Sequence, residues 1–188
     1  MLLSDGTMGQ MMEPVSLDMG EVKEYDKSSW AACGTNCERK HNVVNSLFIQ
    51  PEELEKYNFE RYERYAQIEA NEVMYDEYKM EDAEICIVAY GVAARVSQNA
   101  IDKAREQGIK VGMIRPITLW PFPKAPFLNA TKHVETFISV ELSMGQMIED
   151  VRLAIECSRP VTLCNRAGGM IPTPDEVLSV IRKAEKGE

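Results

Sequence analysis

Several polar residues directly follow predicted strands, where they could bind an anion. The segment Ser143-Met144-Gly145-Gln146 has the Ser-x-x-Gln form of a capping box, and the N–H groups of a helix opening at Ser143 could hold an anion. Arg115 and Arg166 could add positive charge. Short glycine-bearing turns are also what any tight strand-to-helix connection requires, so a purely structural role stays open. The candidate residues for this strand-end loop site or interface are Gly91, Arg115, Glu141, Ser143, Gly145, Gln146, Arg166 and Gly168.

Cysteine and histidine offer little further chemistry. Cys33, Cys37 and His41 recur every four residues, which on a helix would place two sulfur atoms and one nitrogen atom on one face. A fourth metal ligand is missing and Gly34 disfavours a helix, so free thiols are the preferred interpretation. Because no Cys-x-x-Cys occurs, we do not expect this chain alone to hold an iron–sulfur cluster. We assign no catalytic, cofactor-binding or metal-binding residue.

Motifs for nucleotide phosphates are also missing. The sequence has no P-loop and no Gly-x-Gly-x-x-Gly after a strand, where it reads only Tyr90-Gly91-Val92-Ala93. Ser4-Asp5-Gly6 with the distant Asn36 loosely resembles the motif by which thiamin diphosphate enzymes hold magnesium. Pro14 and Gly20 would interrupt the helix that this geometry needs. We therefore expect no cofactor to be bound by this chain.

Hydrophobic patterning predicts the elements that position the candidate residues. Four apolar runs have the pattern of strands covered on both faces, and helical patterns follow them. Thr173-Pro174-Asp175-Glu176 is a second capping box, with proline at the first helical position. This alternation predicts an α/β fold with a mostly parallel sheet. The predicted strands are residues 84–90, 110–115, 135–141 and 160–165, and a short helix is predicted over residues 124–130.

The region before residue 83 differs in composition and is interpreted as an arm. Residues 51–82 carry eleven acidic and four basic residues, and Leu54, Tyr57, Tyr65 and Ile68 form one stripe of an amphipathic helix that begins at Pro51. The acidic face of this helix is interpreted as an ordinary solvated surface. Short strands are predicted over residues 21–25 and 43–49.

Charge and composition limit the class of partner and the compartment. The 188 residues carry a net charge of −9, which disfavours nucleic acid and anionic membrane surfaces as partners. The sequence contains neither an apolar run long enough to span a membrane nor the pattern of a signal peptide. Five cysteines without framework spacing indicate reduced thiols. These features predict a cytoplasmic protein.

Several segments together resemble the alpha subunit of 2-oxoacid:ferredoxin oxidoreductases, of the 2-oxoisovalerate or branched-chain group. The resemblance covers essentially the whole chain, and its most specific string is Arg-Pro-Ile-Thr-Leu-Trp-Pro-Phe-Pro at residues 115–123. The segments that carry it are SDGTMGQMMEPV at residues 4–15, NSLFIQPEELE at 45–55, Tyr90-Gly91, RPITLWPFP at 115–123, ELSMGQM at 141–147 and RAGGMIP at 166–172.

This resemblance implies a fold and a division of the chain. Residues 83–188 would form a three-layer α/β/α domain similar to the transketolase C-terminal domain, with one strand usually antiparallel. Residues 1–15 would be a remnant of a preceding pyrimidine-binding domain, and residues 16–82 a linker arm. The full pyrimidine-binding domain of the family is absent from this sequence, so we expect a C-terminal portion of the subunit.

The resemblance also implies a function. The complete complex would decarboxylate a 2-oxoacid oxidatively to an acyl-CoA, with thiamin diphosphate, magnesium and iron–sulfur clusters held elsewhere and electrons passed to ferredoxin. This chain would be an assembly domain, inactive alone, whose partners are the other subunits and a further copy of itself. A different class of function stays open, namely a free-standing flavodoxin-like module that binds a phosphate-bearing ligand after Glu141.

Overall fold

The computed structural model describes residues 1–4, 6–12, 14, 16–18, 20–22, 24–32, 34, 36, 38–43 and 45–187. It divides into two units, one of Met1–Gln10 with Arg64–Glu188 and one of Met11–Glu63, and each unit is described by itself. The elements in chain order are α1 (Gly6–Gln10), α2 (Pro51–Asn71), β1 (Tyr75–Tyr78), β2 (Ile85–Val88), α3 (Gly91–Glu106), β3 (Val111–Pro116), α4 (Lys124–Ala130), β4 (Thr136–Glu141), α5 (Met147–Ala154), β5 (Val161–Asn165) and α6 (Pro174–Glu185).

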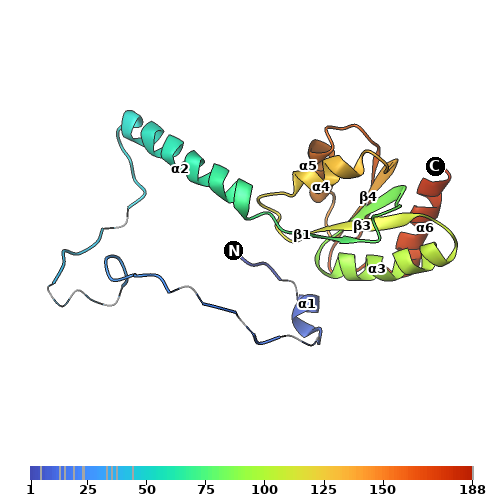
Figure 1. Cartoon of the computed structure of the whole chain (residues 1–188), viewed down its shortest axis with the longest axis horizontal. Coiled ribbons are helices and arrows are strands. Elements are labelled where there is room, and N and C mark those ends of the chain that lie inside the picture. Colours follow the sequence, from blue (N-terminus) through green and yellow to red (C-terminus); the bar gives the residue numbers. More distant parts are fainter. Residues whose placement is uncertain are drawn as a thin grey trace. The chain divides into compact units, whose positions relative to one another are not determined.

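The first unit is built on a β-sheet (Figure 1). The sheet has five strands in the order β1-β3-β2-β4-β5. Strands β2 to β5 run parallel, and β1 pairs antiparallel with β3. All four strands predicted from apolar patterning are present, and the predicted three-layer α/β/α fold is confirmed. The antiparallel strand that the family resemblance implies is β1, at one edge of the sheet.

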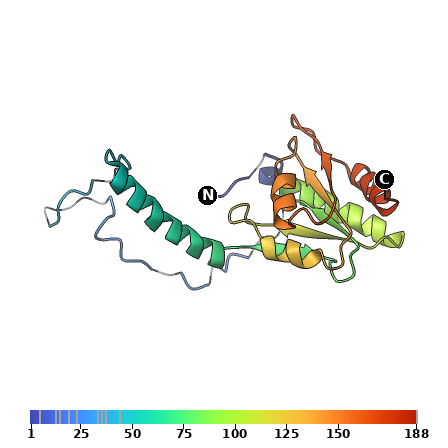
Figure 2. The same ribbon diagram turned by 90° about the horizontal axis from the view of Figure 1, so that it is seen from above.

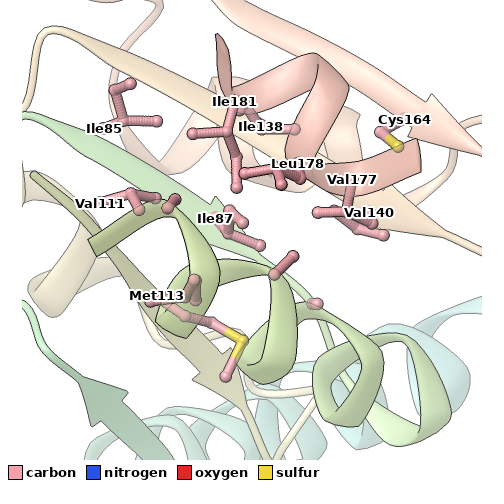
Figure 3. Close-up of a cluster of buried hydrophobic side chains, with 14 of the residues drawn as sticks. Ile85, Ile87, Val111, Met113, Ile138, Val140, Cys164, Val177, Leu178 and Ile181 are labelled. Atoms are coloured by element: carbon pink, nitrogen blue, oxygen red, sulfur yellow. The ribbon is translucent and has the colours of Figure 1, made fainter. Parts of the chain in front are cut away.

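Two hydrophobic clusters lie on opposite faces of the sheet, because its central strands are buried on both sides. All four residues of β2 are buried, and side chains of this strand alternate between the clusters. Helices α3 and α6 cover one face, where Ile87, Ile138 and Ile181 belong to one hydrophobic core cluster (Figure 3). Helices α4 and α5 cover the other face (Figure 2). Phe127 and Phe137 are fully buried there.

The sequence predicts that residues 16–82 form an arm, whereas the structure places β1, which lies in that range, in the sheet. The chain leaves β1 and passes over the start of β3 before it enters β2. A Cβ atom added at Gly112 would lie 2.5 Å from the Lys79 carbonyl oxygen, so only glycine fits beneath this crossing. Arg105 of α3 holds the crossing, because its guanidinium donates to the Lys79 carbonyl oxygen at 2.7 Å and to Asp82 Oδ1 at 2.7 Å.

The predicted amphipathic helix is present as α2 and begins at Pro51 as expected. None of its residues is buried, and Tyr57 stacks on Phe48 with ring centroids 4.8 Å apart. The short strands predicted over residues 21–25 and 43–49 are wrong for the described residues of those ranges, which have no ladder partner. Asp5, Cys33 and Cys37, which the sequence singled out, lie outside the described residues. Throughout the described ranges, no helix is long and apolar enough to cross a membrane.

Candidate functional site

The eight candidate residues lie at or directly after the carboxyl ends of the parallel strands. Because parallel strands end at the same edge, the topology gathers segments that are far apart in sequence. Gly91 is the first residue of α3, with φ at +57°, and Arg115 is the next-to-last residue of β3. Glu141 ends β4, and the remaining candidates follow it or follow β5. These are Ser143, Gly145 and Gln146 after β4, and Arg166 and Gly168 after β5.

Glu141 makes the most hydrogen bonds among the candidate residues, because its buried carboxylate accepts from the backbone N–H groups at the start of α5. Its side chain is 3% exposed. Oε2 accepts from the backbone N–H groups of Gln146 at 2.8 Å and Met147 at 3.1 Å, and Oε1 accepts from the N–H of Ile148 at 2.8 Å. Two hydroxyl groups complete the shell. Ser139 Oγ donates to Oε1 at 2.8 Å, and Ser143 Oγ donates to Oε2 at 2.7 Å.

These five hydrogen bonds keep Glu141 ionised. Burial disfavours the charged form and would raise the pKa of the carboxyl group. The N–H of Gln146, the hydroxyls of Ser143 and Ser139 and the N–H of Ile148 outweigh that effect, so the pKa of Glu141 lies below its ordinary value. The first N–H groups of α5 therefore face a negative charge that belongs to the chain itself.

The N–H groups at the start of α5 are therefore not free to hold the anion that was considered possible near Ser143. The capping box expected from Ser143 and Gln146 is also wrong, because α5 begins at Met147 and Gln146 makes no side-chain cap. Ser143 instead donates to Glu141 and accepts from the N–H of Gly145 at 3.3 Å. The pattern misled because a carboxylate from the end of β4 reaches the same N–H groups that a local serine would cap.

The two candidate arginines do not converge on the start of α5. Arg115 Nη1 lies 3.7 Å from Asp76 Oδ2 on β1, and Arg166 pairs with Glu176 on α6. Each arginine thus links a strand end to another element of the same unit. Gly168 has φ +66°, which explains a glycine there by backbone geometry.

Sequence analysis missed a set of exposed apolar side chains on the same loops, which we call the carboxyl-edge strip. They follow β2, β3, β4 and β5, and they are at least 38% exposed. The signal was present in the sequence, because these loops carry large apolar residues where polar turn residues are usual. Single exposed apolar residues are common on protein surfaces, whereas these seven all follow strands at the same edge of the sheet. The strip consists of Tyr90, Ile117, Leu119, Trp120, Leu142, Met144 and Met170.

The described residues form no site that suits the metal ion or the diphosphate of the cofactors that the family resemblance implies. No group of three or more His, Cys, Asp or Glu side chains that could hold a metal ion occurs within the described ranges. The start of α5, which could have cradled a diphosphate, is filled by Glu141. We derive no chemical step through such a group.

Comparison with known proteins places the chain in a family. The model of the family described as pyruvate:ferredoxin oxidoreductase core domain II matches residues 83–177, which is half of the chain. The chain belongs to this family. The match begins at β2 and ends in the first turn of α6, so it covers the parallel strands and the loops of the candidate site.

Curated relatives extend the similarity toward the amino terminus. The chain is 47% identical over 182 residues to the ketoisovalerate oxidoreductase subunit VorB of Methanothermobacter marburgensis, covering 97% of this chain and 51% of that protein. It is 34% identical over 101 residues to the 2-oxoglutarate synthase subunit KorA of the same organism, covering 54% of this chain and 27% of the relative. The chain thus spans about half the length of the VorB relatives it matches.

These relatives correct one expectation. The family is as expected, but VorB is a beta subunit, so the assignment to the alpha subunit is wrong. Turn and strand patterns specify the fold that subunits of this kind share, and they do not specify which subunit carries it.

Solved structures agree on the fold. The 2-oxoglutarate:ferredoxin oxidoreductase of Magnetococcus marinus matches with a TM-score of 0.67 at 21% identity, covering 81% of this chain and 28% of that chain. A split-gene transketolase in an inactive beta4 tetramer matches with a TM-score of 0.50 at 17% identity, covering 56% and 39%. At these identities the likeness concerns the fold alone.

Proposed function

We propose that this chain is the carboxyl-terminal part of a subunit of a 2-oxoacid:ferredoxin oxidoreductase that acts on 2-oxoisovalerate. The complete complex would decarboxylate this acid oxidatively, form an acyl-CoA and pass electrons to ferredoxin. The observation that carries the proposal is the 47% identity to a ketoisovalerate oxidoreductase subunit over nearly all of this chain. The chain would work in the cytoplasm, without nucleic acid or membrane partners.

Within that complex, we propose that residues 83–188 act as an assembly domain and make no catalytic contribution alone. The carboxyl-edge strip supports this role, because exposed Trp120, Met144 and Met170 suit contact with another protein surface. Thiamin diphosphate, magnesium and the iron–sulfur clusters would be held by other parts of the complex. Residues 1–15 would belong to a preceding domain and residues 16–82 to a linker arm.

Reconstitution tests the proposed activity. The chain is to be co-expressed with the remaining subunits and assayed for reduction of a viologen dye that depends on both the 2-oxoacid and CoA. We expect activity with 2-oxoisovalerate that exceeds activity with 2-oxoglutarate or pyruvate, and no activity from the chain alone. A complex that reduces the dye equally well without this chain would refute the assembly role. Preference for 2-oxoglutarate or pyruvate would refute the proposed substrate.

The alternative of a phosphate-binding module is disfavoured by Glu141, whose carboxylate occupies the N–H groups that such a ligand would need. Calorimetric titration of the chain with FMN, and separately with ATP, is expected to give no heat of binding. Binding of either ligand with micromolar affinity or better would favour the module over the subunit.

A further inference from the structure

The two outer strands of the sheet differ in what they offer to another strand. An outer strand presents unpaired N–H and C=O groups, and proteins usually protect such an edge with charged residues or short strands. Strand β1 is four residues long and carries Asp76 and Glu77. Strand β5 is Val161-Thr162-Leu163-Cys164-Asn165 and contains no charged residue.

The hydrogen bonds of β5 identify its free groups. The Phe137 N–H donates to the Pro160 carbonyl oxygen at 3.0 Å, and the Arg166 N–H donates to the Glu141 carbonyl oxygen at 3.1 Å. With the parallel register of β4 and β5, these bonds assign the even-numbered residues of β5 to β4. The backbone groups of Val161, Leu163 and Asn165 therefore point away from the sheet.

These outward groups are available for pairing. Within the part of the chain that the structure describes, the N–H and C=O of Leu163 have no hydrogen-bond partner. The Val161 carbonyl oxygen has one long contact, with Arg152 Nη2 at 3.5 Å on an exposed side chain that can move aside. Leu163 is partly exposed, so the rest of the chain does not fully cover this edge.

The charged residues of the two outer strands favour pairing of β5 with a second copy of itself over the same pairing of β1. If two copies of β5 pair antiparallel about a two-fold axis at Leu163, Leu163 faces its own copy and Val161 faces Asn165. Arg159 and Arg166 face Ala167 and Pro160, so no like charges meet. The same operation centred on Asp76 or Glu77 of β1 would set that acidic residue opposite its own copy, and like charges directly opposite destabilise a strand pair.

We propose that β5 is a dimerisation edge, at which a second copy of this chain continues the sheet by antiparallel pairing of β5 with β5. Each of the three facing pairs exchanges N–H···O bonds in both directions, with Cα atoms about 5.5 Å apart. The contact is isologous, so it closes after two copies. This inference rests on the edge of β5 and stands independently of the proposed enzymatic function.

Opposite charges placed at the axis test the proposal in the full chain. L163K and L163E each place like charges opposite one another in a homodimer, whereas an equimolar mixture places Lys opposite Glu. By sedimentation velocity we expect the unmodified chain to be dimeric at tens of micromolar. Each variant is expected to have a dimer dissociation constant raised at least about tenfold, and the mixture to recover the dimer. E77K on the other edge, the matched control, is expected to leave dimerisation unchanged.

Three results would overturn the proposal. They are an unmodified chain that is monomeric at about 100 µM, variants that remain dimeric, and a mixture that stays monomeric although both variants melt cooperatively. Should either variant fail to fold, hydrogen exchange of the unmodified chain decides. The Leu163 amide is expected to be protected in the dimer and to exchange faster on dilution. An amide that exchanges equally fast at all concentrations would exclude pairing through β5.

Discussion

Helices α5 and α6 both begin at the carboxyl edge of the sheet, but their first N–H groups are satisfied in different ways. In α6 the cap is local, because Thr173 Oγ1 accepts from the Glu176 N–H at 3.3 Å and Glu176 Oε2 accepts from the Thr173 N–H at 2.8 Å. In α5 the cap comes from Glu141 at the end of β4, whose buried carboxylate accepts from three N–H groups. A local cap fixes only the start of a helix, whereas a cap carried by a strand also ties that helix to the sheet.

The largest effect is expected from removing the charge of the buried cap. Glu141→Gln leaves an amide NH2 group facing N–H donors, so the free energy of unfolding should fall by about 2–4 kcal/mol, measured by urea denaturation. The matched control, Glu176→Gln at the exposed cap, should cost about 1 kcal/mol or less. Equal losses of unfolding free energy in the two variants would mean that the buried cap of α5 contributes no more stability than the exposed cap of α6.

The same contrast should depend on pH. Because the pKa of Glu141 is lower in the folded chain than its ordinary value of 4.5, the stabilisation is complete above the pKa of the unfolded chain. It is lost as pH falls through the lower, folded pKa. The difference in unfolding free energy between the unmodified chain and Glu141→Gln should therefore shrink below about pH 4.5, as followed by urea denaturation from pH 7 to pH 3. A difference in unfolding free energy that stays constant from pH 7 to pH 3 would contradict a stabilising role for the ionised carboxylate of Glu141.

A smaller effect is expected at the local cap. Thr173→Ala removes the hydroxyl that accepts from the Glu176 N–H, which should cost about 1 kcal/mol in thermal or urea unfolding. Thr173→Ser keeps the hydroxyl and should retain most of the stability. If the serine variant were as unstable as the alanine variant, the threonine methyl group and not the cap would be responsible.

The smallest effect is expected at Gln146. The Ser-x-x-Gln pattern predicted that its side chain would cap the helix, but the structure uses only its backbone N–H. Gln146→Ala should therefore change the unfolding free energy by less than about 0.5 kcal/mol. A loss of about 1 kcal/mol or more would restore the capping box that the sequence suggested.

The comparison also explains how far the sequence could predict the fold. The strands that are buried on both faces and the capping box at Thr173 depend on neighbours in the sequence, and both were predicted correctly. Strand β1 was missed because Tyr75-Asp76-Glu77-Tyr78 lies in an acidic region and gains its place only by pairing with β3. A polar outer strand carries no apolar period that could reveal it.

The sequence predicted where in the fold the candidate residues lie, but it did not predict the hydrogen bonds that they make. Glu141 and Ser143 were found at the right edge because parallel strands must end together. That the carboxylate turns back onto the N–H groups of α5 depends on the path of the loop between them, which the spacing of residues does not specify. The sequence did not predict the carboxyl-edge strip, because an apolar residue in a loop can be either buried or exposed and its type does not tell which.

The strand order has a consequence for the way the chain is made. Strands β1 and β2 are consecutive in the chain, yet β3 lies between them. When the polypeptide emerges from the ribosome, β1 has no strand to pair with until Val111–Pro116 is free to insert beside it. Strand β1 can therefore join the sheet only together with or after β3, and the passage over Gly112 is completed in the same step.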